Sequence, residues 1–512
     1  MPTTTPTAPA RLPRATPESH GVDQAVLERL VATLDGLRDV HSLMVLRHGS
    51  VVAEAWWHPY APDETHTMFS VSKSFTATAV GLAAAEGLLR TDDRVIDLLP
   101  DDAPAEPSAH LSAMTVRDLL TMTSGHGTDT MNFTLTNLHV PGSSWAQAIL
   151  AAPVVHEPGT RFVYNTGATY LLSAILHRLT GERLLDYLTP RLLAPLGITG
   201  ATWEQCPRGI DVGGYGLRLT TEELAVFGQL LLQRGTWGGE QLVPAAWVDE
   251  MTAAQVPNGP DQNVEWAQGY GYQFWRCRGD AYRADGAFGQ FCVVSPGRDM
   301  VVVLTAGAQA THLELEAALD AMDAVVGAAP GAGAPADGGS FSPRDLAVAV
   351  PHGTAHEPLE DFVRGSTFTL EGHDGGAPDT PDGPQPGSPA RHTRSVLRWH
   401  SVGIDRKGDE IELGWTLAGS TERQVVRCGV GHWVVGRARV DDEDLPVAGA
   451  AAWTAPHELT CRLLWRGTPF ALDARLTFGG DGEGRWVELA VDQNVSFGPT
   501  ALLRATGLGA TP

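Results

Sequence analysis

Met68-Phe69-Ser70-Val71-Ser72-Lys73-Ser74-Phe75 is the stretch around which the rest of the chain is organised. It opens a run of apolar and small residues that ends at Gly87, and such a run is typical of a helix buried on all sides. Ser70 and Lys73 are three residues apart, so they share one face of that helix. Desolvation and the positive helix end both lower the pKa of a lysine held there, and its amine can then take a proton from a serine hydroxyl.

Lysine is almost absent from the chain, which carries only Lys73 and Lys407. Its other positive charges are arginines, and a guanidinium cannot deprotonate to act as a base. The presence of a lysine three residues after Ser70, in a chain that otherwise uses arginine, therefore favours a chemical role for Lys73. On the local pattern alone, an ion-paired or snorkelling Lys73 beside a helix-capping Ser70 is an equally good interpretation.

Composition limits the class of protein. The 512 residues are enough for two or three domains, and a formal net charge of -24 argues against nucleic acid and anionic membranes as partners. No apolar run is long enough to span a bilayer. The five cysteines are scattered and lack CxxC spacing, which indicates neither a disulfide framework nor a zinc site. We therefore expect a cytoplasmic protein, in an oligomeric state that the sequence leaves open.

The pattern of elements predicts two domains. Residues 14–326 contain a helix, a hairpin, a long helical insert, a second hairpin and a last helix, which predicts an α+β fold with an antiparallel sheet. Residues 327–341 are rich in Gly, Ala and Pro and are predicted to be a linker. Residues 342–512 hold short alternating runs that predict an all-β barrel or sandwich. Residues 1–13 lack an apolar segment and are predicted to be a disordered tail.

Capping and periodicity place the elements of the N-terminal domain. Thr311 is predicted to begin the last helix, with a capping box to Glu314. Helical spacing predicts helices over 22–37, 169–180 and 221–233, and apolar runs on either side of turn residues predict hairpins over 42–57 and 288–305.

Five stretches follow one another in this domain, and the first contains Ser70 and Lys73. They are Ser70-Val71-Ser72-Lys73, Leu119-Leu120-Thr121-Met122-Thr123-Ser124-Gly125-His126, Phe162-Val163-Tyr164-Asn165-Thr166-Gly167, Gly213-Gly214-Tyr215-Gly216-Leu217 and Asp285-Gly286-Ala287-Phe288-Gly289-Gln290. From about residue 14 to 325 the chain resembles the β-lactamase-related serine hydrolases. That group includes class C β-lactamases, penicillin-binding DD-peptidases, family VIII esterases, D-aminopeptidases and 6-aminohexanoate-dimer hydrolases. The all-β part resembles the lipocalin-like domains that follow some members.

The resemblance implies hydrolysis of an ester or amide bond in a small-molecule substrate through an acyl-enzyme on Ser70, without a metal or cofactor. Lys73 and Tyr164 would be the general bases and acids, and the phenol's pKa is expected to fall beside a cationic lysine. The backbone N–H groups of Ser70 and Ala287 would form the oxyanion hole.

The resemblance also implies a set of substrate-binding residues, namely Asn165, Tyr272, Asp285 and Gly286. Tyr272 belongs to an aromatic stretch, 269–275, for which a pocket wall and a buried strand are equally good interpretations. The chain departs from its relatives at Thr166, where they have Asn, and at Ala284, where they carry a cationic side chain. Both departures favour an ester or amide substrate over a β-lactam or a carboxylate-bearing peptide.

Two other functions stay open at this point. The same site would serve an acyltransferase that hands its acyl group to an amine or alcohol instead of water. Alternatively, the chain is a non-catalytic binding protein on a hydrolase scaffold, with the β domain facing its partner.

Overall fold

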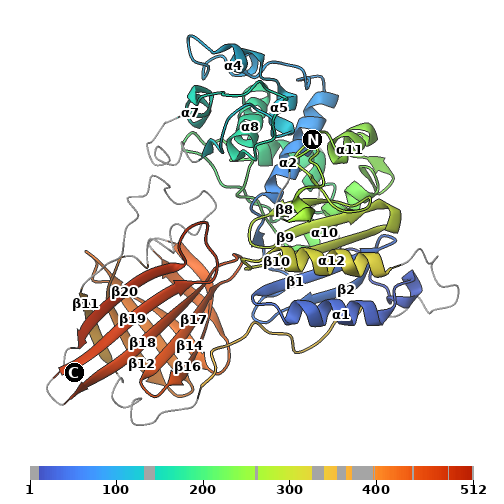
Figure 1. Cartoon of the computed structure of the whole chain (residues 1–512). Coiled ribbons are helices and arrows are strands. Elements are labelled where there is room, and N and C mark those ends of the chain that lie inside the picture. The colour runs from blue at the N-terminus through green and yellow to red at the C-terminus, as the bar shows by residue number, and fades with distance from the viewer. Residues whose placement is uncertain are drawn as a thin grey trace, which may run out of the picture.

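The computed structural model of the chain describes residues 11–131, 144–259, 263–325, 339–353, 365–371, 396, 398–440, 443–481 and 484–509. Figure 1 shows a sheet flanked by helices, a helical region above it, and a β-barrel beside it. The predicted α+β domain followed by a barrel is confirmed. In the described ranges, no helix combines the length and apolarity needed to cross a bilayer.

A six-stranded antiparallel sheet, in the order β2-β1-β10-β9-β8-β7, forms the centre of the N-terminal domain within the described residues. Successive side chains of a strand point to opposite faces of a sheet. On β1, Leu43 lies in the core shared with α1 (Gln24–Asp35) and α12 (His312–Ala324), whereas Met44 lies in the core shared with α2 (Val71–Ala85) and α10 (Thr221–Leu232). The strands are β1 (Val40–Arg47), β2 (Ser50–Trp56), β7 (Trp275–Arg276), β8 (Tyr282–Gly286), β9 (Gln290–Ser295) and β10 (Met300–Ala306).

The helix α2 (Val71–Ala85) is buried along most of its length, as its sequence predicts. Gly81 lies so close to Trp247 that a Cβ atom there would be 2.1 Å from the indole nitrogen. The same indole N–H donates to the carbonyl of Ala77 at 3.1 Å. This close contact fixes α2 against α11 (Ala245–Thr252). The other helices of the region are α3 (Val95–Leu98), α4 (Ala109–Ala113), α5 (Val116–Leu120), α7 (Trp145–Ala151), α8 (Thr166–Thr180), α9 (Leu184–Leu188) and α10 (Thr221–Leu232).

The C-terminal domain is a barrel. Its described residues form a 10-stranded sheet, and a parallel pairing of β14 with β16 closes nine of these strands into a ring, with β15 outside it. Trp399 and Trp415 stack inside it with their ring centroids 4.8 Å apart. The lipocalin-like resemblance stays a prediction. The strands are β11 (Ser366–Glu371), β12 (Trp399–Lys407), β13 (Glu410–Leu417), β14 (Arg423–Val430), β15 (Val434–Val440), β16 (Glu443–Ala455), β17 (Glu458–Trp465), β18 (Ala471–Asp481), β19 (Gly484–Gln493) and β20 (Ala501–Gly509).

The domain limits agree only partly with the predicted ones. Leu12, assigned to the tail, is buried, and its N–H donates to Glu222 at 2.9 Å. Residues 1–10, and most of the predicted 327–341 linker, lie outside the described part. Phe341 bridges to Ala53 on β2, so the chain runs along the edge of the N-terminal sheet before it enters the barrel.

The predicted capping box at Thr311 is wrong, because Thr311 makes no side-chain cap bond. A capping residue needs extended backbone, whereas Thr311 is helical at φ -59°, ψ -17°. Capping boxes form instead at the starts of α5 and α10. The predicted helices and hairpins otherwise correspond to α1, α8, α10, β1–β2 and β9–β10.

The two domains are joined by polar contacts at several points. The Arg462 guanidinium of the barrel lies 2.5 Å from the Asp39 carboxylate, and both side chains are buried. Asn494 donates to the carbonyl of Gly307 at 2.8 Å. A buried ion pair between the domains helps to fix their relative position, because moving them apart would leave a buried charge without its partner.

Candidate active site

The N-terminus of α2 brings Ser70 and Lys73 together. Ser70 is the N-cap of the helix, and the Nζ atom of Lys73 lies 3.0 Å from its Oγ. The same amine donates to the carbonyl oxygen of Gly214 at 2.8 Å and lies 3.4 Å from the Thr166 hydroxyl. Three neighbours therefore orient the amine.

The Lys73 amine is almost wholly buried, with 1% of the residue exposed. Burial lowers its pKa to about 7, although the carboxylates of Asp129 and Asp285 oppose the shift. This agrees with the shift expected from the sequence. A substantial fraction of the amine is then uncharged near neutral pH.

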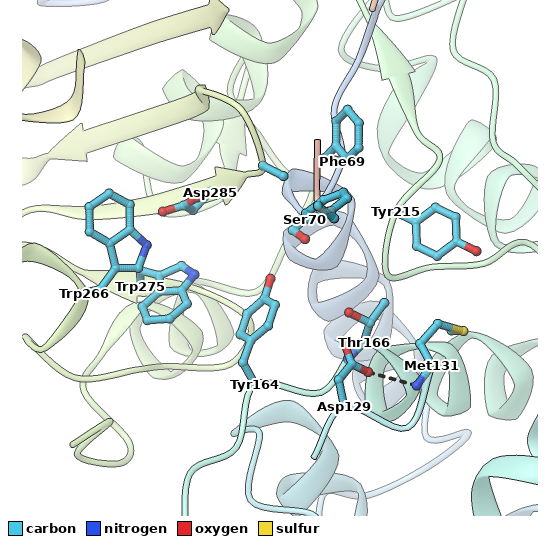
Figure 2. A pocket seen from close by; sticks show the side chains of 12 residues that line it. Phe69, Ser70, Asp129, Met131, Tyr164, Thr166, Tyr215, Trp266, Trp275 and Asp285 are labelled. Carbon is cyan, nitrogen blue, oxygen red and sulfur yellow. Dashed lines mark hydrogen bonds between the residues drawn. The ribbon is translucent and has the colours of Figure 1, made fainter. Parts of the chain in front are cut away.

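Tyr164 faces the same hydroxyl. Figure 2 shows its phenol pointing toward Ser70, and the Lys73 amine lies 4.9 Å from the centre of its ring. The predicted fall in its pKa is wrong. Burial raises the pKa of Tyr164 well above its usual value, and the hydrogen bond with Ser70 offsets this only in part. Tyr164 is therefore a neutral phenol that can donate a proton.

These groups open into a cavity of about 400 Å³. Half of its lining residues are aromatic, and two carry carboxylates (Figure 2). Its lining residues are Phe69, Ser70, Asp129, Met131, Tyr164, Thr166, Tyr215, Trp266, Trp275, Asp285, Ala287 and Phe497.

The predicted oxyanion-hole residues lie together in this cavity. Ser70 and Ala287 both line it, and within the described part of the chain neither of their backbone N–H groups donates to a protein acceptor. Gly286 packs where a Cβ atom would be 2.3 Å from the Met68 carbonyl oxygen. A glycine is needed there because β8 passes so close to the chain that leads into Ser70.

Residues 27–326 match the family described as Beta-lactamase. The chain belongs to the β-lactamase family. The 6-aminohexanoate-dimer hydrolase of Paenarthrobacter ureafaciens is 25% identical over 279 residues, which span 51% of this chain and 71% of that protein. Protein flp of Staphylococcus aureus (strain MW2) is 28% identical over 164 residues, or 31% of this chain and 33% of flp.

The fold of this β-lactamase-family domain also resembles solved structures. One, described as a "putative 6-aminohexanoate-dimer hydrolase" from Bacillus anthracis, superposes with a TM-score of 0.51 at 20% sequence identity. The match covers 63% of this chain and 89% of the other. It establishes a common fold and carries no information about the substrate.

Asn165, expected at the substrate of this β-lactamase-family site, lies elsewhere. It is fully buried and caps α8, where its Oδ1 accepts from the N–H groups of Thr130 and Gly167, both at 3.0 Å. Its amide group lies 3.4 Å from the Ser124 hydroxyl. All of these contacts tie together loops beside the cavity, so Asn165 has a structural role.

Tyr272 is also absent from the cavity wall. Its hydroxyl donates to Glu250 at 2.7 Å and accepts from Arg117, and its ring packs on Trp247. Each interpretation of the aromatic stretch 269–275 holds for one of its residues. Trp275 lines the cavity, whereas Tyr272 is a core residue.

Asp285 lines the cavity as predicted, but its charge is partly compensated. Arg283 lies 2.8 Å from it and is fully buried, with its guanidinium 4.6 Å from the Trp266 ring. Burial raises the pKa of Asp285, and the Arg283 charge opposes that rise. Arg283 is therefore the ion-pair partner of Asp285 and does not line the cavity.

Asp129 and Trp266 line the cavity but were missed in the sequence. The Asp129 carboxylate accepts from the N–H groups of Met131 and Thr166, at 3.0 and 2.9 Å, and so helps to place the Thr166 hydroxyl near Lys73. Both residues lie in segments without periodicity. The sequence held one signal for this part of the site, namely the departure from the relatives at Thr166. The Thr166 hydroxyl contacts the Lys73 amine.

Proposed function

We propose that the protein is a serine hydrolase that cleaves ester or amide bonds through an acyl-enzyme on Ser70. The observation that carries this proposal is the 3.0 Å contact between Lys73 Nζ and Ser70 Oγ, made by an amine whose pKa burial lowers to about 7. A nucleophile beside a base that is uncharged at working pH is the arrangement that acyl transfer needs.

The surroundings of Lys73 support its role as the base. A neutral amine has two N–H bonds and one lone pair. The Gly214 carbonyl and the Thr166 hydroxyl can accept the two N–H bonds, which leaves the lone pair for the proton of Ser70. A lysine that served only as a counter-ion would be expected to lie against a carboxylate, and no such ion pair to Lys73 occurs among the described residues.

The proposed reaction balances as follows. Ser70 Oγ bonds to the carbonyl carbon while its proton passes to Lys73, and the N–H groups of Ser70 and Ala287 stabilise the oxyanion. The bond from the carbonyl carbon to the leaving oxygen or nitrogen then breaks, and Tyr164 donates its proton to that leaving atom and regains one from the Lys73 ammonium. A water molecule then attacks the acyl carbon and gives one proton to Lys73. The bond from that carbon to Ser70 Oγ breaks, the proton passes to Oγ, and the carboxylic acid product leaves.

The cavity favours an uncharged or cationic substrate over an anionic one. Asp129 and Asp285 face it, and among the described lining residues there is no arginine or lysine for a substrate carboxylate. This supports an ester or amide over a β-lactam, and the similarity to a 6-aminohexanoate-dimer hydrolase suggests that amides be tested. The five cysteines are free and buried, and we propose a cytoplasmic location.

A fluorophosphonate probe tests the nucleophile directly. Wild type and the control Ser112→Ala, at a partly exposed serine of α4, should be labelled, and Ser70→Ala should not. Labelling that persists in Ser70→Ala would remove Ser70 from its role. A folded wild type that resists the probe would favour the non-catalytic alternative.

A screen of p-nitrophenyl esters, nitrocefin and D-amino-acid amides would then define the substrate class. Product analysis with an added amine or alcohol separates hydrolysis from acyl transfer at the same serine.

A further inference from the structure

Four phenylalanines form a cluster where the two domains meet, beside Ser70. Phe69 and Phe288 come from the N-terminal domain, and Phe470 and Phe497 come from barrel loops. The rings of Phe69 and Phe288 meet edge to face at 5.4 Å between centroids. Phe470 lies 6.1 Å from Phe69 and 5.6 Å from Phe288, and Phe497 lies 4.7 Å from Phe288.

Both N-terminal members of this phenylalanine cluster have strained backbones. Phe69 has φ 47° and Phe288 has φ 67°, in the left-handed region that side chains with a Cβ atom avoid. Such conformations persist where the surrounding structure holds them. Phe69 directly precedes Ser70 and Phe288 directly follows Ala287, so the strain lies beside both proposed oxyanion donors.

The barrel holds both segments. The buried Phe69 and Phe288 side chains belong to the hydrophobic core of the barrel, not to that of their own domain. On one side, the Gly467 carbonyl accepts from the N–H of Thr67, two residues before Phe69, at 2.9 Å. On the other, Asn494 donates to the Gly307 carbonyl, and the next residue, Ala308, donates to the Phe288 carbonyl at 3.1 Å.

We infer that the barrel is part of the catalytic apparatus, with Phe470 acting as a positioning residue for the oxyanion hole. Its ring holds Phe69 and Phe288 in their strained conformations and thereby aims the N–H groups of Ser70 and Ala287 into the cavity. Phe497 shares this role and also forms a cavity wall, so it contacts the substrate beside Ser70. The inference rests on the proposed acyl-enzyme function and explains why a hydrolase domain carries this barrel.

Phe470→Ala separates positioning from packing. Phe470 does not line the cavity, so KM for a p-nitrophenyl ester should change less than twofold while kcat falls. Small misplacements of catalytic groups cost up to about 100-fold in rate. We expect a fall in kcat of about 10- to 100-fold, and a similar loss of affinity for phenylboronic acid, whose tetrahedral adduct uses the oxyanion hole.

Phe478→Ala is the matched control, because Phe478 is an equally buried phenylalanine of the barrel whose ring contacts Phe368 and Trp453. It removes the same ring from the same core and should leave kcat near wild type. Phe470→Leu, which refills most of the space, should recover part of the lost rate. If Phe470→Ala does not fold, Phe470→Leu and Phe497→Ala test the inference in its place. Phe497 is 53% exposed, so its replacement by alanine leaves no cavity in the core.

Equal effects of Phe470→Ala and Phe478→Ala, or no effect of Phe470→Ala and Phe497→Ala on kcat, would overturn the inference. Either result leaves the proposed function intact as long as Ser70→Ala abolishes turnover. Conversely, undiminished turnover by Ser70→Ala would refute the proposed function, and this inference with it.

Discussion

The Lys73 amine lies closer to the Gly214 carbonyl oxygen, at 2.8 Å, than to the Ser70 hydroxyl, at 3.0 Å. The carbonyl holds one N–H bond of the amine and so limits its rotation. Gly214 lies 141 residues from Lys73, in one of the stretches that mark the family resemblance. Lys73 is thus oriented by the fold as well as placed by its helix.

Replacing Lys73 with arginine should stop turnover while keeping the positive charge. General-base catalysis contributes about 10²- to 10⁴-fold, so we expect kcat for an ester to fall at least 100-fold. Lys407→Arg is the matched control, since it changes the chain's other lysine in an exposed pair with Glu412 and should leave kcat unchanged. A near-normal rate for Lys73→Arg would make Lys73 a counter-ion.

The activity should depend on pH through Lys73. Its pKa is lowered to about 7, and in the proposed reaction the neutral amine is the base. The value of kcat/KM for an uncharged ester should therefore rise as pH increases through about 7 and level off above it. Steady-state rates between pH 5 and 9, at constant ionic strength, check this. A profile that falls as pH rises through this range would contradict the assigned base.

Tyr164→Phe should slow turnover about 100-fold or more, because the phenol's proton no longer reaches the leaving group. Tyr272→Phe provides the comparison, since Tyr272 is a buried tyrosine whose hydroxyl bonds to Glu250 away from the cavity. Its kcat and KM should match wild type. Equal rates for the two variants would show that Tyr164 is only a packed aromatic.

Asn165→Ala should act mainly on stability. The change removes the cap of α8 and leaves buried N–H groups of Thr130 and Gly167 without their acceptor, at a cost of about 2 kcal/mol in the free energy of unfolding. Denaturant unfolding measures this. Ser108→Ala, the same kind of loss at the short α4, should cost about 0.5–1 kcal/mol. If the two costs are equal, the buried network around Asn165 contributes nothing beyond an ordinary cap.

Much of the fold could be predicted because it depends on local periodicity. The apolar runs of β1, β10 and α2 reflect burial on all sides, and the structure has those elements within a few residues of the predicted bounds. The capping box at Thr311 failed because a Thr-x-x-Glu pattern does not specify the backbone angle of its first residue. That angle depends on how the preceding chain enters the helix.

The site was predicted only in part, for a similar reason. Ser70 and Lys73 share a helix turn, so their proximity follows from spacing alone. Asn165 and Tyr272 were misplaced because motif order does not say which side chain of a stretch faces a cavity. Neighbouring residues of a strand or loop point in opposite directions, and only packing against other elements decides between them.

The sequence by itself determined the proximity of Ser70 and Lys73, the sheet with its two buried faces, and the alternation of the barrel strands, because each of these depends on the spacing of residues along one element. The tertiary structure alone decided the rest. It set the pKa of Lys73 through burial, kept Tyr164 neutral, and brought Phe497 to within reach of Ser70 across 427 positions of the chain. Such features depend on which surfaces pack together and exclude water, and this is a property of the whole fold.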